Sequence, residues 1–271
     1  QIDDNSIDLT VTSPPYDNLR DYKGYSFNFE TIAKELFRIT KEGGIVVWVV
    51  GDATINGSET GTSFRQVLFF MDCGFRLHDT MIYKKSGAPP RYPNIKRYTN
   101  CFEYMFILTK GNVGTFNELK DRRNISANTS RWSGQRQKDG SIKRTNIWKT
   151  EEISGRFNIW EYGIGYNQTT KESYAFQHPA MFPEKLAKDH ILSWSNKGDL
   201  VLDPFVGSGT TCKIAKLQGR KFIGIDISEE YCKLAKKRIR QESLLPLVDK
   251  KEGGKGIPPT NKLVGILPKI L

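Results

Sequence analysis

The fold of this chain is decided by Leu200-Val201-Leu202-Asp203-Pro204-Phe205-Val206-Gly207-Ser208-Gly209-Thr210-Thr211. A short apolar strand runs into a turn with two glycines, and the residues after the turn continue as a helix. Gly207 and Gly209 permit positive φ values and a close approach of the backbone to a ligand. The helix that begins near Thr210 offers N–H groups that have no partner within the helix. The stretch therefore predicts a strand–turn–helix that binds a ligand at its turn.

The turn lacks the features of a phosphate-binding site. A dinucleotide fingerprint needs a third glycine, a P-loop needs Lys-Ser or Lys-Thr, and neither is present. Asp203 instead places a carboxylate at the mouth of the turn, where it would repel a pyrophosphate and attract a cation. Asp226 ends the next apolar run, 23 positions later, where an acid can accept hydrogen bonds from ribose hydroxyls. S-adenosylmethionine, a nucleoside with a cationic extension, fits this description. The alternative is that the glycines serve tight packing and that Asp226 lies beside a helix cap.

A second strand end carries two prolines. Ile7-Asp8-Leu9-Thr10-Val11 predicts a strand, and Thr12-Ser13-Pro14-Pro15-Tyr16 follows it directly. Prolines cannot donate to a sheet ladder and have a fixed φ, so the backbone leaves the strand rigid and extended. The hydroxyl of Ser13 and the aromatic face of Tyr16 flank carbonyls that no local N–H claims, which suits a flat polar ring such as a nucleobase. The alternative is a strand that ends in a plain Pro-Pro turn.

The excess positive charge is concentrated in one stretch. The 271 residues carry a net charge of +11, and residues 84–150 hold 15 basic against 4 acidic residues, whereas the remainder holds 26 of each. Aromatic residues are interleaved with the basic ones, as in Arg131-Trp132 and Trp148-Lys149, which suits phosphate contacts and base stacking. The alternative is a solvated charged face. The candidate nucleic-acid contacts are Arg91, Lys96, Arg97, Arg122, Arg123, Arg131, Arg136, Lys143 and Arg144.

The rest of the chain alternates strands with helices. Ile45–Val50 is a continuous apolar, mainly β-branched run, typical of a strand buried on both faces of a parallel sheet. The alternation predicts an α/β fold with a mainly parallel sheet, whose ligands bind beyond the carboxyl ends of the strands. Periodicity is lost between Gly111 and Tyr174, which is either a small functional subdomain or partly disordered. The expected helices are 29–39, 64–71, 183–194, 212–217 and 228–240, and further strands are expected at 75–83, 102–108 and 263–267.

The order of these motifs resembles that of a known enzyme family. Ser13-Pro14-Pro15-Tyr16, then a basic stretch, then Asp203 to Thr211 look like the amino-group DNA methyltransferases, and the order is similar to their permuted β-class. His178-Pro179-Ala180-Met181-Phe182-Pro183 resembles the family segment that lines the methionine end of the cofactor. The resemblance covers residues 3–110 and 176–240. It implies a Rossmann-like fold with helices on both faces of the sheet, made of a catalytic half (1–110), a target-recognition insert (111–175, basic from near 84), a cofactor-binding half (176–245) and a tail (246–271).

The resemblance also implies a role for each motif. Ser13 Oγ and the Pro14 carbonyl would accept hydrogen bonds from a target amino group, and Tyr16 would stack on a base flipped out of duplex DNA. Serine at the first motif position resembles the cytosine-N4 enzymes and aspartate is usual in the adenine-N6 enzymes, so cytosine-N4 is favoured and adenine-N6 is the alternative. The catalytic residues implied are Ser13, Pro14, Pro15 and Tyr16. The residues implied to bind S-adenosylmethionine are Asp203, Pro204, Phe205, Gly207, Ser208, Gly209, Thr210, Asp226, His178, Pro179 and Phe182.

Double-stranded DNA is the expected partner. The resemblance further implies a homodimer and a cognate restriction endonuclease, as in a restriction–modification system. The rival functions are a nucleic-acid-binding protein without catalysis and an RNA methyltransferase. The four cysteines form no CxxC pair and no apolar run reaches the ~18 residues of a membrane span, so a cytoplasmic protein without a metal site or membrane contact is expected.

One family feature is absent from the start of the chain. A strand with a Gly-Asp pair, close to the cofactor adenine, usually precedes the catalytic motif, whereas this chain begins Gln1-Ile2-Asp3-Asp4. Two explanations are open: the chain begins inside a longer protein, or a tail strand near Val264 takes the place of the missing one.

Overall fold

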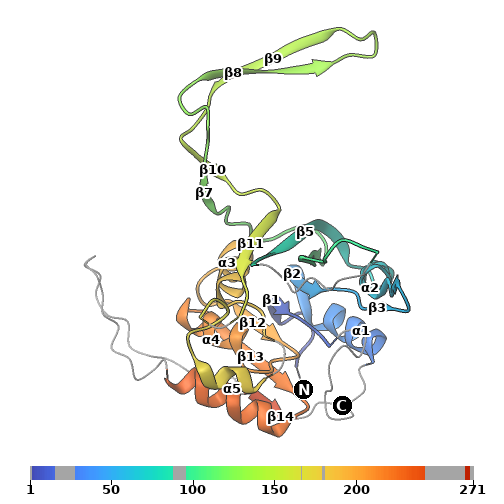
Figure 1. Cartoon of the computed structure of the whole chain (residues 1–271), viewed down its shortest axis with the longest axis vertical. Helices are drawn as coiled ribbons and strands as arrows, with labels where there is room; N and C mark the ends of the chain where they lie inside the picture. Colours follow the sequence, from blue (N-terminus) through green and yellow to red (C-terminus); the bar gives the residue numbers. More distant parts are fainter. Residues whose placement is uncertain are drawn as a thin grey trace, which may run out of the picture. The chain divides into compact units, whose positions relative to one another are not determined.

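The structure is a computed structural model, and it describes residues 2–15, 28–87, 96–165, 167–178, 181–241 and 266–268. The chain divides into two compact units, one of residues 1–117 and 158–271 and the other of residues 118–157 (Figure 1). Three of the predicted site residues, Tyr16, Arg91 and Pro179, lie outside the described residues.

The larger unit is built on one eight-stranded sheet with the order β11-β5-β6-β2-β1-β12-β13-β14. Within this sheet β6 runs antiparallel to both of its neighbours, and the other neighbouring strands pair in parallel. The sheet confirms the predicted α/β fold. Its strands are β1 (Ile7–Thr12), β2 (Thr40–Val50), β5 (Arg76–Ser86), β6 (Phe102–Thr109), β11 (Ile159–Gly163), β12 (Leu200–Asp203), β13 (Lys221–Asp226) and β14 (Ile266–Pro268).

Helices cover both faces of this sheet, as Figure 1 shows. Two of them, α1 and α2, pack together over β2, β5 and β6, whereas α3, α4 and α5 pack over β1, β12 and β13. The helices are α1 (Phe29–Ile39), α2 (Thr62–Asp72), α3 (Glu184–Trp194), α4 (Thr210–Leu217) and α5 (Glu229–Gln241), with a 3-10 turn at Ser173–Gln177 and a short hairpin of β3 (Thr54–Ile55) and β4 (Ser58–Glu59).

The core explains why β2 is apolar along its length. Val46, Trp48 and Val50 join the buried cluster under α1 and α2. Because side chains alternate along a strand, the equally buried residues between them face α3 to α5. The indole Nε1 of Trp48 donates to Gln66 Oε1 at 2.9 Å, so the polar group of this buried ring is satisfied.

The strand order changes direction between β1 and β12. From β12 the sheet continues through β13 to β14, and from β1 it continues the other way through β2. In open α/β sheets a ligand binds in the crevice outside the carboxyl ends of the strands at such a switch point. The Pro-Pro motif follows the carboxyl end of β1 and the glycine turn follows that of β12. The topology therefore brings both motifs to the carboxyl ends of two adjacent strands at the switch point.

The smaller unit consists of two antiparallel strand pairs. β7 (Lys120–Arg123) pairs with β10 (Ile153–Gly155), and β8 (Ser130–Arg136) pairs with β9 (Ile142–Lys149). Residues 118–157 are fewer than the insert of 111–175 expected from the sequence, because β11 returns to the main sheet at Ile159 and pairs with β5. The strand expected at 263–267 lies at Ile266–Pro268, where it pairs in parallel with β13.

Candidate active site

A hydrogen bond joins the two predicted motifs. The hydroxyl of Thr12, the last residue of β1, donates to Asp203 Oδ1 at 2.7 Å, and both residues are buried. Thr211 Oγ1, in the first turn of α4, donates to the carbonyl of Val11 at 3.0 Å. Motifs that are about 190 positions apart in the sequence are thus in direct contact at the switch point.

The predicted catalytic segment continues directly from this contact. Ser13, Pro14 and Pro15 follow Thr12 at the carboxyl end of β1. Pro14 is buried, and Ser13 and Pro15 are half-buried. Ser13 therefore directly follows the residue whose side chain donates to Asp203.

Asp203 lies at the centre of the site. It is 2% exposed and also accepts a hydrogen bond from the backbone N–H of Phe205 at 3.1 Å. Burial raises the pKa of its carboxyl to about 6, a change that the hydrogen bond from Thr12 opposes and the nearby charge of Asp226 increases. The negative charge at this position consequently depends on pH in a range close to neutrality.

Both predicted glycines are required by the geometry of the turn. Gly207 has φ +47° and Gly209 has φ +86°, values that favour glycine. A Cβ at Gly207 would lie 2.7 Å from His178 Nε2, and a Cβ at Gly209 would lie 2.9 Å from Cβ of Ala235. Any side chain would therefore push the turn away from the segments behind it.

Asp226 holds the turn from the adjacent strand. Its Oδ2 accepts a hydrogen bond from the N–H of Gly207 and its Oδ1 accepts one from the N–H of Ser228, both at 2.9 Å. Burial raises the pKa of this carboxyl above its ordinary value. The side chain is half-buried, and each carboxylate oxygen can accept more than one hydrogen bond. Asp226 can thus hold the N–H groups of Gly207 and Ser228 and still accept hydrogen bonds from a ligand.

The remaining predicted cofactor residues divide into two groups. His178 is half-buried, packs edge-on against Tyr231 with ring centroids 4.5 Å apart, and lies against Gly207. Pro204, Phe205 and Phe182 are half-buried around the turn and the segment before α3. The side chains of Ser208 and Thr210, in contrast, are buried and accept hydrogen bonds from inside the protein.

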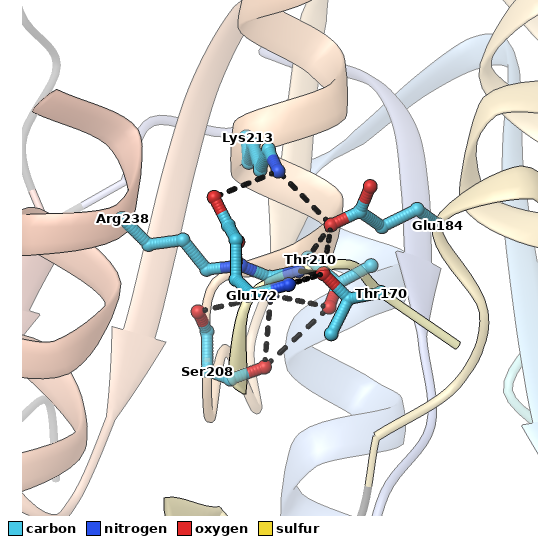
Figure 2. Close-up of polar contacts among 7 residues, drawn as sticks. All are labelled: Thr170, Glu172, Glu184, Ser208, Thr210, Lys213 and Arg238. Carbon is cyan, nitrogen blue, oxygen red and sulfur yellow. Dashed lines mark hydrogen bonds and ion pairs between the residues drawn. The ribbon is translucent and has the colours of Figure 1, made fainter. Parts of the chain in front are cut away.

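The donor to Ser208 and Thr210 is Arg238 of α5, which the sequence did not single out. Its side chain belongs to a buried cluster of charged and hydroxyl groups, shown in Figure 2. The basic run Lys236-Lys237-Arg238 looks like a solvated helix face. A weak signal was available, because Arg238 lies three positions after the buried Ala235 and therefore on the same side of the helix.

Two other polar groups of the main unit have structural partners. Asp52 accepts hydrogen bonds from the N–H of Ser63 at 2.9 Å and from its hydroxyl at 2.5 Å, at the start of α2. His190 is fully buried, and burial lowers its pKa to about 3, so its ring is neutral. Its Nδ1 accepts a hydrogen bond from Trp194 Nε1 at 3.3 Å.

The predicted DNA contacts differ in their surroundings. Arg97 donates to Thr54 Oγ1 at 2.5 Å and to the carbonyl of Gly57 at 3.2 Å, which ties it to the β3–β4 hairpin. Arg122 donates to the carbonyl of Gly155 and lies 4.2 Å from the ring centre of Phe157. These two arginines have contacts within the protein. The exposed candidates are Lys96, Arg97, Arg123, Arg131, Arg136, Lys143 and Arg144.

Most of the exposed candidates lie on the β8–β9 hairpin. Arg144 lies 4.3 Å from the ring centre of Trp132 on the partner strand. A Cβ at Gly134 would meet Ile142 and Trp132, so these two side chains close over a glycine on one face of the hairpin. Arg131 pairs with Trp148, and Gln135 pairs with Lys143, in the ladder. The hairpin is thus a two-stranded ribbon with basic and aromatic side chains and little burial.

Among the described residues, no cluster of His, Cys, Asp and Glu side chains has the arrangement of a metal site. Within the same residues, no helix is long and apolar enough to cross a membrane.

Comparison with known proteins identifies the family. Residues 7–237 match the N6/N4 methyltransferase family, described as DNA methylase. The chain belongs to this DNA methylase family. It is 55% identical over 260 residues to the orphan methyltransferase M.BamHII of Bacillus amyloliquefaciens, a match that covers 94% of this chain and 96% of that relative. It is 29% identical to the DNA adenine methyltransferase YhdJ of Escherichia coli (strain K12), over 86% of this chain and 76% of that relative.

Solved structures share the fold of this DNA methylase. The cytosine-N4-specific PvuII DNA methyltransferase superposes with a TM-score of 0.64 at 21% identity and covers 93% of this chain and 83% of its own. The complex of M1.HpyAVI with S-adenosylmethionine superposes with a TM-score of 0.58 at 22% identity, over 86% of this chain and 89% of its own.

Proposed function

We propose that this DNA methylase transfers the methyl group of S-adenosylmethionine to the exocyclic N4 of a cytosine in duplex DNA. Family membership supports methylation of DNA at an amino group. The observation that carries the proposed methyl transfer is the bond between Thr12 and Asp203, because it joins the segment suited to a base to the turn suited to the cofactor.

The residues of the turn fit S-adenosylmethionine. Asp203 ends β12 and places an acid at the turn that leads to the N-terminus of α4, where a phosphate would otherwise be expected, so it suits the cationic end of this cofactor. Asp226, at the end of the adjacent strand, would accept hydrogen bonds from the ribose hydroxyls. The positive φ at Gly207 and Gly209 lets the backbone approach the ligand closely. When bound, the cofactor would supply an electrophilic methyl group on its sulfonium sulfur.

The catalytic segment would act on the target nitrogen through hydrogen bonds. The lone pair of an exocyclic amino group is delocalised into its ring, so the nitrogen is a weak nucleophile. Ser13 Oγ and the carbonyl of Pro14 would each accept a hydrogen bond from one amino N–H, which draws the nitrogen toward tetrahedral geometry and localises its lone pair. Positioning and electrostatics would supply most of the rate. The base must leave the helix to reach this segment, and Tyr16 would stack on it.

The choice of cytosine rests on Ser13. A hydroxyl at this position resembles the cytosine-N4 enzymes, and the PvuII enzyme, which shares the fold, is named as cytosine-N4-specific. The alternative is adenine-N6, the base named for YhdJ. Methylation at C5 of cytosine is disfavoured, because it needs a nucleophilic cysteine and none of the four cysteines follows a proline.

The smaller unit would bind the DNA. A two-stranded antiparallel ribbon fits the major groove, where each base pair presents a distinct pattern of hydrogen-bonding groups. The β8–β9 hairpin carries exposed Arg131, Arg136, Lys143 and Arg144, which suit phosphate oxygens or guanine edges. A homodimer and a cognate endonuclease stay predictions from the family resemblance.

The proposal is tested by methyl transfer from labelled S-adenosylmethionine to DNA, followed by identification of the modified nucleoside. We expect N4-methylcytosine, and N6-methyladenine would instead establish the alternative. Ser13→Ala should lose at least about a hundredfold in rate while its cofactor affinity stays close to that of the wild type. The matched control is Ser6→Ala, which removes a hydroxyl bonded to the carbonyl of Asp3 at the amino end of the same strand and should leave the rate unchanged.

Two results would overturn this assignment. Full activity of Ser13→Ala would exclude its hydroxyl from catalysis. Methyl transfer to RNA but not to DNA, or binding of DNA without any transfer, would favour one of the rival functions.

A further inference from the structure

Arg238 is the most completely engaged side chain in the larger unit's buried polar cluster. The residue is 0% exposed. Its Nη1 donates to Thr210 Oγ1 at 2.9 Å, to Ser208 Oγ at 3.1 Å and to the carbonyl of Ser208 at 3.3 Å. Its Nη2 donates to Thr170 Oγ1 at 3.1 Å and to Glu184, and its Nε donates to Glu172 (Figure 2).

The charges of this cluster balance. Lys213 of α4 is also buried, and its Nζ lies 3.1 Å from Glu172 Oε1 and 3.0 Å from Glu184 Oε1. Two cations therefore meet two carboxylates. Although burial acts to raise the pKa of Glu184, the hydrogen bond and charge of Lys213 hold it below the ordinary value. Loss of one member would leave an uncompensated charge in the interior.

The cluster connects the two segments that border the cofactor turn. On one side Arg238 holds the backbone and hydroxyl of Ser208, which lies between Gly207 and Gly209. On the other side it holds Thr170 and Glu172, in the segment that continues to His178. The ring of His178 lies against Gly207, where a Cβ would come within 2.7 Å of it. The guanidinium of Arg238 thus binds both the glycine turn and the segment that leads to His178.

We propose that Arg238 is a positioning residue for the cofactor site, which sets the separation between the glycine turn and the His178 segment. The proposal rests on the proposed use of S-adenosylmethionine at this turn. Arginine is needed because a planar fork of five N–H donors can hold both segments at once, which the single ammonium of lysine cannot do. Without it the turn and the segment would separate, and the site would be too wide for its ligand.

A matched arginine in the same unit separates positioning from stability. Arg220 is 8% exposed and donates to Ser195 Oγ at 3.0 Å, to the carbonyl of Ser195 at 2.7 Å and to that of Gln218 at 2.7 Å. It precedes β13 and so lies at the amino end of the strand that Asp226 ends. The experiment compares Arg238→Lys and Arg238→Met with Arg220→Lys and Arg220→Met in the full chain.

Four quantities are measured for each variant: the melting temperature without ligand, the dissociation constant of S-adenosylmethionine by calorimetry, kcat, and KM for the cofactor. We expect both Arg238 variants to bind at least about tenfold more weakly, with the lysine variant less affected, because a site whose support is loosened loses affinity before it unfolds. Their kcat at saturating cofactor should stay within about threefold of the wild type, since the reacting groups lie elsewhere. The Arg220 variants should melt earlier and keep the wild-type dissociation constant.

A variant with a milder change keeps the test decisive if the Arg238 variants do not fold. Glu172→Gln removes one carboxylate from the guanidinium and keeps the shape of the side chain, and it should weaken cofactor binding in the same direction. Wild-type cofactor affinity in folded Arg238 or Glu172 variants would overturn the positioning role of Arg238 and leave the proposed function untouched. Equal weakening in the Arg220 variants would also overturn it, because the effect would then follow stability. Absence of cofactor binding in the wild type would instead remove the proposed function.

Discussion

Replacement of Thr12 by valine tests the contact on which the site depends. Valine has nearly the same shape, so the change removes only the hydroxyl that donates to Asp203 Oδ1 at 2.7 Å. A hydrogen bond to a charged group contributes about 1.5–3 kcal/mol, and 1.36 kcal/mol corresponds to one pKa unit, so the pKa of Asp203 should rise by about one to two units. Its starting value is about 6, because burial already raises it.

This shift has a calculable effect on cofactor binding. If the cationic end of S-adenosylmethionine needs the Asp203 carboxylate, the carboxylate is about nine-tenths ionised at pH 7 in the wild type and about half to one-tenth ionised in Thr12→Val. Affinity at pH 7 should therefore fall about two- to tenfold. At pH 9 the two proteins should bind almost equally, because both carboxyls are then largely ionised.

Ionisation of Asp203 has opposite effects on the stability of the fold and on the affinity for the cofactor. Since the folded-state pKa of Asp203 is raised by burial, its contribution to stability is fully present below the unfolded pKa and is lost as pH rises through about 6 in the wild type. Lowering the pH from 7 toward 4 should thus favour the fold through this group while it weakens cofactor binding. Asp203→Asn has no carboxyl at this position. Any pH dependence of stability or of cofactor binding that persists in this variant therefore comes from other titrating groups.

The assay is calorimetry with S-adenosylmethionine between pH 5 and pH 9, together with thermal melting without ligand. Thr10→Val is the matched control, because Thr10 lies on the same strand, is fully buried, and its hydroxyl has no hydrogen-bond partner among the described residues. It should leave the pH dependence of binding unchanged. If the midpoint of the binding curve in Thr12→Val coincides with that of the wild type, the hydroxyl does not control the charge of Asp203, and the reasoning is refuted.

Two further predictions concern the ribose of the cofactor and the DNA contacts of the β8–β9 hairpin. Asp226→Ala should weaken S-adenosylmethionine binding about tenfold or more, through lost hydrogen bonds to the ribose and a looser turn; an unchanged dissociation constant measured by calorimetry would exclude the ribose role. Lys143→Ala with Arg144→Ala should lower DNA affinity and reduce the slope of log K against log salt by up to about 2, because each phosphate contact contributes about 0.9 to that slope. Lys233→Ala, an exposed lysine paired with Glu229 on α5, is the control for loss of charge and should leave the salt slope as it is. Equal slopes in all three proteins would place the DNA elsewhere.

The sequence predicts the elements of this fold where burial leaves a pattern. The run Ile45–Val50 became the carboxyl-terminal half of β2, and the strand expected at 102–108 became β6 (Phe102–Thr109), because most residues of both runs are buried in the sheet. The helix expected at 64–71 extends over Thr62–Asp72, where Asp52 bonds to its first turn from outside the helix. Such an end depends on a tertiary contact, which a local pattern does not contain.

Other features leave no local pattern at all. The β8–β9 hairpin is exposed over most of its length, so its residues show none of the alternation that marks a strand buried on one face. Arg238 resembles any basic residue of an exposed helix until α5 packs against the turn. The hydrogen bond between Thr12 and Asp203 forms only because the strand order places β1 beside β12. The strands and helices buried on the sheet can therefore be predicted from sequence, but the contacts among the candidate site residues cannot.

The position of β1 has a consequence for the synthesis of this protein. One edge of β1 pairs with β2, but its other edge pairs with β12, whose Asp203 lies 191 positions after Thr12. A ribosome adds about 5–20 residues per second, so this edge waits roughly 10–40 s for its partner. Leu9 and Val11 are apolar and fully buried in the folded protein. Through that interval the sheet that buries them is incomplete. The nascent chain is consequently exposed to aggregation at β1, and chaperone dependence should be greatest before residue 203 emerges.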